Sequence, residues 1–254
     1  GTATDLTLPS GITQIDAYAF SGCTSLLSIT IPDSVTSIGN SAFYNCSSLT
    51  SVTIPDSVTS IVNCAFQYCS SLTSVTIGNG VTSIGSGVFF GCTSLTSITI
   101  GNGVTSIGDD AFRGCSSLKS VTIPNNVTSI GSSAFRGCSS LTDVYITDIA
   151  AWCRISFGYS DANPLYYAKN LYLNNNLVTA LTIPDSVTSI GNYAFYECPS
   201  LTSVTIGNSV TSIGSSAFYY CRSLKSVTIG NGVTSIGTYA FYECPSLTSV
   251  TIGN

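Results

Sequence analysis

The chain repeats itself with a period of 23 residues over most of its length. A representative copy begins at Leu49 and reads Leu-Thr-Ser-Val-Thr-Ile-Pro-Asp-Ser-Val-Thr-Ser-Ile-Val-Asn-Cys-Ala-Phe-Gln-Tyr-Cys-Ser-Ser. A fixed period in this range is typical of stacked coils rather than of a globule with an enclosed pocket. The repeat therefore favours recognition on an extended surface over chemistry in a cleft.

The copies follow one another at 23-residue steps, and one stretch breaks the step. Regular copies begin at Ala3, Leu26, Leu49, Leu72, Leu95, Leu118, Val178, Leu201, Leu224 and Leu247, and a degenerate copy opens at Leu141. We predict a single repeat domain over residues 1–254. It has regular repeats in 3–140 and 178–254 and an irregular island at 141–177.

The pattern within a copy predicts its local structure. We number positions from the leucine that opens the copy. Positions 4 and 6 are apolar and alternate with Ser at 3 and Thr at 5, which indicates a half-buried strand. Val-Thr-Ser-Ile at positions 10–13 follows a turn and predicts a second short strand, and Gly at position 14 ends it. We expect the Ala-Phe-x-x-Cys segment at positions 17–21 to form one helical turn.

A single copy cannot fold alone, because its few large apolar side chains do not offset the entropy of ordering 23 residues. Stacking adds hydrogen bonds between coils and buries one coil against the next. In register, each position forms a column at the strand spacing of about 4.8 Å. We expect an internal file of phenylalanines at position 18: Phe20, Phe43, Phe66, Phe89, Phe112, Phe135, Phe195, Phe218 and Phe241.

The motif Leu-x-Ser-[Val/Ile]-Thr-Ile-Pro-x-x-Val-x-x-Ile-Gly-x-x-Ala-Phe-x-x-Cys-x-Ser resembles the BspA-type leucine-rich repeat. The resemblance covers almost the whole chain, and Ala-Phe-x-x-Cys after Ile-Gly is its most specific part. It implies an α/β-type, β-rich, right-handed solenoid with a parallel concave sheet, a second short strand and one helical turn per coil. It also implies a surface or secreted protein of host-associated bacteria or protozoa, with adhesion as the usual proposed role.

Nine of the eleven cysteines occupy repeat position 21, and Cys64 and Cys153 lie outside that column. An even spacing of 23 residues matches no metal-binding motif. Neighbouring members of the column are close enough for a disulfide by distance, but their side chains run parallel and their number is odd. We interpret the column as small buried hydrophobic side chains.

Variation among copies concentrates at positions 15, 16, 19 and 20. Tyrosine and arginine, which are enriched where binding energy concentrates at interfaces, recur there. The candidate partner-binding residues are Tyr193, Tyr196, Tyr219, Tyr220, Tyr239, Tyr242, Arg113 and Arg136. The alternative is neutral drift at exposed positions, with each ring covering its neighbour. The Ser and Thr of positions 3 and 5 are interpreted as a solvated strand face.

The irregular island opens as a normal strand at Leu141 and then departs from the pattern. Asp148 is placed to cap a short helix over 149–155, Leu171-Tyr-Leu173 predicts a strand, and Asn174-Asn-Asn176 predicts a hairpin-like connection.

Aromatic side chains are dense in the island. Trp152, Tyr166 and Tyr167 are candidates to hold a peptide or sugar. The alternative, which the sequence favours, is that Trp152 and its neighbours form a small core that plugs a lengthened coil, because a large ring rarely stays exposed without reason.

Composition excludes several kinds of function. Only 7% of residues are charged and the net charge is −5, so we expect no nucleic-acid partner and no binding to anionic lipid. No apolar run approaches the roughly 20 residues of a membrane helix. Histidine is absent, and no acid–base pair, activated nucleophile or phosphate loop is present. We therefore predict no enzymatic activity, no cofactor and no metal site.

These observations predict a non-enzymatic extracellular or cell-surface binding scaffold, or adhesin, that recognises a protein or glycan. Host extracellular molecules are one class of candidate. The alternative is a structural spacer or surface-layer stalk that presents another domain. The chain contains no methionine and stops at Asn254, partway through a copy, so we expect a piece of a longer exported protein. The open edge of its last strand, residues 247–252, invites self-association.

Overall fold

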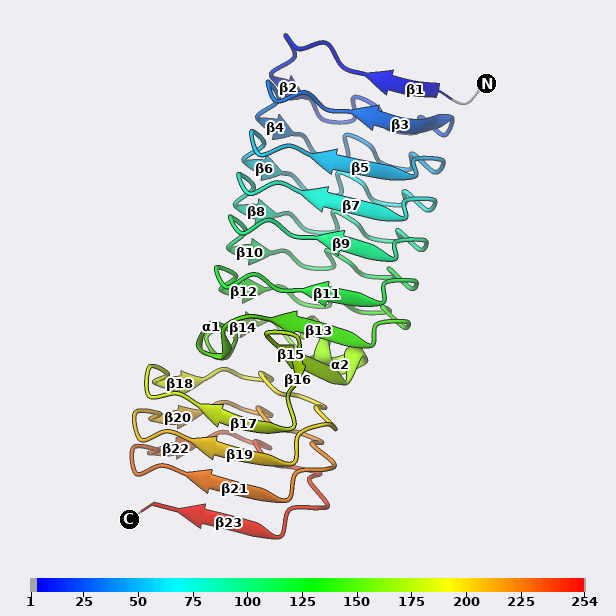
Figure 1. Ribbon diagram of the computed structural model, residues 1–254. Coiled ribbons are helices and arrows are strands. Elements are labelled where there is room, and N and C mark those ends of the chain that lie inside the picture. The colour runs from blue at the N-terminus through cyan, green and yellow to red at the C-terminus, as the bar shows by residue number, and fades with distance from the viewer. Residues whose placement is uncertain (1–3, 254) are drawn as a thin grey trace.

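A computed structural model of the chain describes residues 4–253. The chain winds into coils that stack along one axis, so the N- and C-terminal ends lie at opposite ends of the molecule (Figure 1). Each regular coil contributes one longer strand and one two-residue strand, and each kind of strand pairs in parallel with its counterparts in neighbouring coils.

The longer strands form the face that we call the long-strand face. They are β1 Thr4–Thr7, β3 Leu26–Thr30, β5 Ser51–Ile54, β7 Ser74–Ile77, β9 Ser97–Thr99, β11 Ser120–Thr122, β13 Asp143–Ile146, β15 Asn170–Leu173, β17 Ala180–Ile183, β19 Ser203–Ile206, β21 Ser226–Ile229 and β23 Ser249–Ile252. They pair in the orders β1-β3-β5-β7-β9, β11-β13-β15-β16 and β17-β19-β21-β23, where β16 is Asn176–Leu177 of the island.

The two-residue strands form a second set of sheets. They are β2 Gln14–Ile15, β4 Ser37–Ile38, β6 Ser60–Ile61, β8 Ser83–Ile84, β10 Ser106–Ile107, β12 Ser129–Ile130, β14 Ser156–Phe157, β18 Ser189–Ile190, β20 Ser212–Ile213 and β22 Ser235–Ile236. They pair in the orders β14-β12-β10-β8-β6-β4-β2 and β18-β20-β22. Both strand sets are therefore interrupted at the island.

Residues 23 apart are strand partners at most joins between regular coils; the exceptions are a register shift at Thr4 in β1 and the boundary between β9 and β11, which belong to separate sheets. Ser51 pairs with Ser74 and Val52 with Val75, for example. The alternation along each longer strand then buries positions 4 and 6 and leaves positions 3 and 5 toward solvent, as in the exposed–buried pattern of β5 and β7. The predicted in-register solenoid is confirmed.

The phenylalanines of position 18 stack inside the coils. Ring centroids are 4.9–5.6 Å apart from Phe20 to Phe135, and 5.1–5.2 Å apart from Phe195 to Phe241. The predicted internal file is thus present in two pieces, with the island between them.

The Ala-Phe-x-x-Cys segment differs from the predicted helical turn. Among residues 4–253, helices occur only in the island. In the coil that holds Phe43, the left-handed residues Ser41 and Asn45 (φ 54° and 56°) are incompatible with a right-handed helix. Alternate amides point to the next coil instead: Phe43 N donates to Ala65 O at 2.7 Å and Asn45 N to Gln67 O at 2.8 Å. Bonds between coils therefore replace bonds within a helix.

The cysteine column has a hydrogen-bonding role as well as a packing role. All eleven cysteines are free thiols, and eight of them are buried. The Cys115 thiol donates to Phe89 O of the preceding coil at 3.2 Å, and the same contact recurs from Cys69 to Phe43 O. Serine would fit this position poorly, since the surroundings are apolar and the thiol is a weak donor that is cheap to bury.

The island forms its predicted elements and replaces a coil. Asp148 Oδ1 accepts from Ala150 N at 2.7 Å and caps α1 Ile149–Cys153, which confirms the predicted cap. A 3₁₀ turn at Ser160–Ala162 and the helix α2 Leu165–Ala168 follow. The strands β15 and β16 then form a two-residue antiparallel hairpin, as predicted.

Trp152 seals the join between the island and the next regular coil. Its side chain is 1% exposed and packs at 5.5 Å against Phe157. In regular coils a Phe amide donates to the Ala carbonyl of the following coil. At the join, Trp152 Nε1 donates to Ala194 O at 2.8 Å. The fully buried Asn163 adds donations to Ala194 O at 3.2 Å and to Tyr193 O at 2.7 Å. Trp152 is therefore wrong as a candidate contact residue, because burial removes it from any partner.

The last strand of the stack presents apolar side chains. Val250 is 53% and Ile252 65% exposed on β23. Self-association through this edge stays a prediction.

We predict that native protein exposes few of its thiols to an aromatic disulfide reagent. Cys23 is exposed and should react fast, whereas burial raises the pKa of Cys92 and of Cys138 to about 12 and removes their reactive thiolate. Ellman titration should find one fast thiol in native protein and eleven in denaturant. Fewer than nine free groups in denaturant would contradict the assignment of the column as unpaired.

We predict that Asn163→Ala lowers the free energy of unfolding by about 1–3 kcal/mol, because it leaves buried backbone groups of the join without partners. Urea denaturation followed by circular dichroism measures the change. Asn102→Ala, at an exposed turn of a regular coil, is the matched control and should change stability by less than about 0.5 kcal/mol. Equal effects of the two changes would contradict the role given to Asn163.

Candidate partner-binding surface

The variable positions project from the turn side of the coils. Position 18 points into the core, so its neighbours at positions 19 and 20 point outward; Phe218 is fully buried, whereas Tyr219 and Tyr220 are partly exposed. In register, residues at position 19 lie one above another. The surface can therefore be followed coil by coil.

Four tyrosines form one stacked series, which we call the tyrosine ladder: Tyr166, Tyr196, Tyr219 and Tyr242. Centroid distances are 5.8 Å from Tyr166 to Tyr196, 4.9 Å from Tyr196 to Tyr219 and 5.4 Å from Tyr219 to Tyr242. The first member belongs to helix α2 of the island and the others to position 19 of three regular coils. The island and the C-terminal coils thus form a single surface, whereas the sequence pattern predicted two separate groups of candidate residues.

The remaining predicted tyrosines branch from the ladder. Tyr193 contacts Tyr196 edge-on at 6.1 Å, and Tyr239 contacts Tyr242 in the same way at 5.2 Å. Tyr220 lies tilted against Tyr219 at 6.0 Å. Tyr167 meets Tyr166 edge-on at 5.0 Å, and its hydroxyl accepts from Gly137 N at 3.0 Å. The structure therefore gathers all eight predicted tyrosines into one surface.

The two predicted arginines have different surroundings. Arg113 pairs with Asp110 at 3.2 Å and lies over the Phe90 ring at 5.4 Å, so its charge is already engaged. Arg136 is exposed in the coil before the island, and its charge partly opposes the rise in the pKa of Tyr166 that burial causes. Only Arg136 therefore borders the ladder.

Several of these side chains occupy left-handed backbone positions. Tyr193, Tyr220 and Tyr239 have φ of 62°, 60° and 61°. The equivalent positions hold glycine in some coils, as at Gly87 and Gly114, and other residues in the rest, including Tyr18 and Tyr68 of the N-terminal coils. Glycine adopts this conformation without strain, whereas a side chain there costs on the order of 1 kcal/mol. At these positions tyrosine therefore gives a less stable fold than glycine would.

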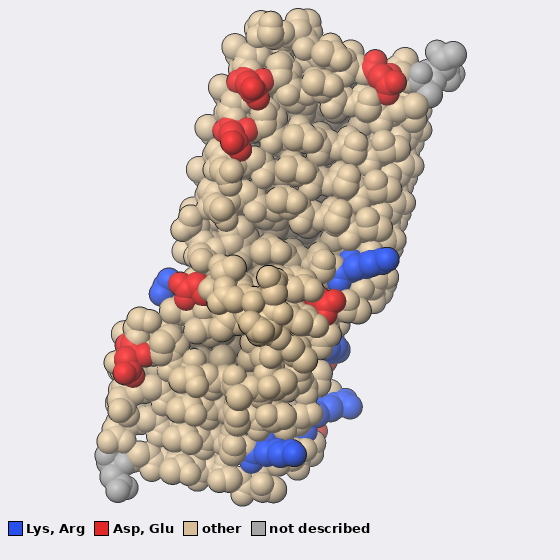
Figure 2. Space-filling view, in the orientation of Figure 1, with Lys and Arg blue, Asp and Glu red and all other residues tan. Residues whose placement is uncertain are grey.

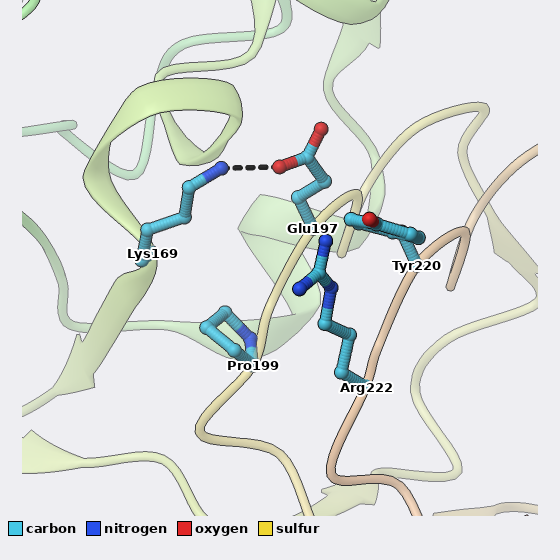
Figure 3. A pocket seen from close by; sticks show the side chains of 5 residues that line it. All are labelled: Lys169, Glu197, Pro199, Tyr220 and Arg222. Carbon is cyan, nitrogen blue, oxygen red and sulfur yellow. Dashed lines mark hydrogen bonds and ion pairs between the residues drawn. The ribbon is translucent and has the colours of Figure 1, made fainter. Parts of the chain in front are cut away.

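A cavity of about 350 Å³ lies beside the ladder, lined by Lys169, Glu197, Pro199, Tyr220 and Arg222 (Figure 3). Lys169 of the island forms an ion pair with Glu197 of the next coil. The Arg222 guanidinium lies over the Tyr220 ring, with Cζ 3.9 Å from the centroid. Of the two ion pairs in residues 4–253, neither includes Arg222. The cavity therefore holds one cation that faces an aromatic ring rather than a carboxylate.

Sequence reasoning missed this cavity. Lys169 of the island and Glu197 of the following regular coil are 28 residues apart, so the 23-residue register does not predict their contact. A signal was available for Arg222: it takes the position that Ser or Pro fills in the neighbouring copies.

Charge is unevenly distributed along the stack. All seven basic residues lie at or after Arg113, whereas six of the twelve acidic residues precede residue 111. On the face in Figure 2, the N-terminal coils show acidic and no basic side chains, and the basic side chains lie further down the stack. The ladder and its cavity therefore occupy the less acidic half of the molecule.

The ladder is uncharged at physiological pH. Burial, with Glu197 and the neighbouring hydroxyls, raises the pKa of Tyr196 to about 12, and burial also raises the pKa of Tyr166 and of Tyr193. The phenols therefore act as hydrogen-bonding groups.

Residues 4–253 contain no cluster of three or more His, Cys, Asp or Glu side chains arranged to hold a metal ion. No helix there has the length and apolarity needed to cross a membrane.

A stack of in-register coils with its distinctive side chains on an outer surface defines a repeat-solenoid scaffold of the kind that binds proteins. The chain belongs to the BspA type leucine rich repeat family, whose repeat region matches in six copies over residues 2–116, 63–160 and 167–254. Among curated proteins, none matches the sequence.

Solved bacterial structures resemble the chain. A leucine-rich repeat protein from Bacteroides ovatus ATCC 8483 is 28% identical, with a TM-score of 0.55 over 96% of this chain and 71% of that one. The pneumococcal vaccine antigen PcpA is 22% identical, with a TM-score of 0.54 over 100% and 73%, a likeness of fold. A leucine rich cell surface protein from Faecalibacterium prausnitzii A2-165 is 27% identical, with a TM-score of 0.45 over 99% and 88%.

We predict that the free energy of unfolding falls between about pH 10 and pH 12. The folded pKa of Tyr196 is raised to about 12 from the ordinary value of 10.0. Its stabilising contribution is therefore complete below pH 10 and is lost as pH rises through 12. Urea denaturation at a series of pH values measures the free energy of unfolding. Comparison with Tyr196→Phe separates the contribution of this phenol from that of the cysteine thiols, which also titrate at high pH. Parallel pH curves for the two proteins would contradict the shift.

Proposed function

We propose that the chain is a non-enzymatic, extracellular or cell-surface adhesin that binds a partner protein through the tyrosine ladder and the adjacent cavity. The observation that carries this proposal is the continuity of the ladder across the island, from Tyr166 to Tyr242. A host extracellular protein is the class of partner that the family resemblance favours. The family also supports the proposed placement outside the cell.

The ladder has the properties of a binding site for a protein. Tyrosine offers a large contact area and a hydrogen-bonding group with little side-chain entropy to lose, and stacking removes part of that loss in advance. Because ladder rings cover one another's faces, the surface presents ring edges and hydroxyls. Such a surface suits the backbone and polar side chains of a protein better than the apolar face of a sugar.

The adjacent cavity gives the surface a charge preference. Arg222 is held over Tyr220 and has no carboxylate within 4.0 Å, while Glu197 is paired with Lys169. An acidic side chain of the partner would give Arg222 the charge-assisted bond that it lacks. We therefore expect a partner that places an Asp or Glu beside an exposed polar segment.

Backbone strain supports selection for binding rather than drift. A side chain at φ near 60° lowers stability, yet three of the tyrosines stand at such positions. Selection for folding alone would favour glycine, which some other coils carry at these positions. The spacer function remains as the alternative, in which the tyrosines only cover one another.

We predict that replacing Tyr196, Tyr219 and Tyr242 together by Ser lowers attachment to immobilised extracellular-matrix or host-cell proteins at least tenfold. Serine occupies the same position at Ser21 of the first copy, so the coil tolerates it. Binding is measured by surface plasmon resonance after pull-down of the partner. Tyr44→Ser, at position 19 of an N-terminal coil, is the matched control and should bind normally.

A second variant separates binding from folding. Tyr220→Gly removes one wall of the cavity and relieves a left-handed tyrosine, so binding should weaken while the melting temperature stays equal or rises. Unchanged attachment by the triple serine variant and by Tyr220→Gly would leave the spacer function as the better account.

A further inference from the structure

One of the two outward rows of the long-strand face, position 5, is uniform except at the island. This position is threonine in every regular longer strand, as at Thr53, Thr99 and Thr205. In the two strands of the island this position holds Tyr145 on β13 and Tyr172 on β15. The exception faces solvent on a different side of the coils from the tyrosine ladder.

Strand register places these two tyrosines side by side in the array. Thr122 pairs with Tyr145 across β11 and β13, and Tyr145 pairs with Tyr172 across β13 and β15. Leu177, 42% exposed, then opposes Tyr172 in the hairpin. The face therefore carries a short apolar ridge between threonine rows.

One ring face of the ridge is open. The two rings stack at 4.8 Å with 19° between their planes, so each covers one face of the other. On the N-terminal side Tyr145 faces Thr122, whose side chain is much shorter than a tyrosine. The outer part of that face of Tyr145 therefore stands free above a floor of threonine and serine hydroxyls.

A polar pair is fixed beside the ridge. Asp143, at position 3 of β13, accepts from Asn170 Nδ2 at 3.0 Å and from Thr142 Oγ1 at 2.8 Å. These bonds hold the carboxylate in one orientation and leave it spare acceptor capacity, since a carboxylate can accept about four hydrogen bonds. Lys119 directly precedes β11, and its carbonyl accepts from Asp143 N at 3.4 Å, but neither of the two ion pairs in residues 4–253 includes Asp143.

We infer that Tyr145, Tyr172 and Asp143 form a subsite for a neutral oligosaccharide. A pyranose ring has an apolar C–H face and a rim of hydroxyls. The C–H hydrogens carry partial positive charge and are attracted to the electron-rich face of Tyr145. The rim hydroxyls find acceptors and donors in Asp143, Asn170 and Thr122. Among the described residues, the Asp143 carboxylate forms no ion pair with a cation within 4.0 Å, so it disfavours uronic and sialic acids.

The repeat supplies a well-controlled test. Tyr145→Thr and Tyr172→Thr install the residue that the regular longer strands carry at position 5, so the fold should be retained. Affinity electrophoresis in gels that contain a β-glucan, a xylan, a mannan or a galactomannan identifies the polysaccharide. Titration with its hexasaccharide, followed by calorimetry, then gives the dissociation constant.

We expect at least one neutral polysaccharide to retard the wild-type chain. Tyr145→Thr should weaken the hexasaccharide at least tenfold, and Asp143→Ser, the residue of the regular copies, should weaken it severalfold. The triple serine variant of the tyrosine ladder should bind the sugar normally. Loss of sugar binding at the ridge can therefore be distinguished from loss of protein binding at the ladder. Absence of retardation by all four polysaccharides, or equal binding by folded Tyr145→Thr, would overturn the inference, and so would preferential retardation by polygalacturonate.

Discussion

Hydrogen bonding between residues 23 apart determines which types of residue each position of the repeat can accommodate. Because one coil lies directly over the next at strand spacing, every side chain must pack against another copy of itself. Flat phenyl rings meet this condition by stacking at 4.9–5.6 Å, and thiols meet it by donating to the carbonyl of the preceding coil. Glycine is favoured at position 14 in most coils, since a Cβ on Gly108 would lie 2.7 Å from Ser86 N; Asp16 and Val62 take this position in two of the N-terminal coils. The composition of the repeat is thus a consequence of its register.

The same register explains which features the sequence could predict. Strand alternation at Val52 and the file through Phe43 follow from period and polarity alone, and both are confirmed. The turn side was harder, because its geometry depends on left-handed residues such as Ser41 that bond to the next coil rather than within a helix. Contacts across the island were beyond prediction. Tyr166 and Tyr196 are 30 residues apart, and no period relates them, so their stacking emerges only when the island is folded.

The island provides hydrogen-bond donors for the backbone carbonyls that an interruption of a solenoid leaves without partners. Omitting a regular coil would leave the Ala194 carbonyl without the amide that normally reaches it. Trp152 Nε1 and Asn163 Nδ2 take over this donation from side chains, and the buried Trp152 ring packs against Phe157. A side-chain donor can approach from a chain path that differs from the regular coil, so the segment from 149 to 177 is free to vary on its outer surface. The Lys169–Glu197 pair and the Tyr166–Tyr196 stack add further contacts across the join.

Specific recognition by a repeat array requires such departures from repetition. On a uniform face, a ligand bound over one coil can shift by one coil and meet the same side chains, so no position is preferred. The serine and threonine rows of the long-strand face have this degeneracy over β3 to β11. Tyr145 and Tyr172 remove it on one side of the coils, and the ladder from Tyr166 to Tyr242 removes it on another. Both begin at the island because only there does the chain stop copying itself. Repetition therefore supplies a rigid support, and the break in repetition would give each proposed ligand a single place to bind.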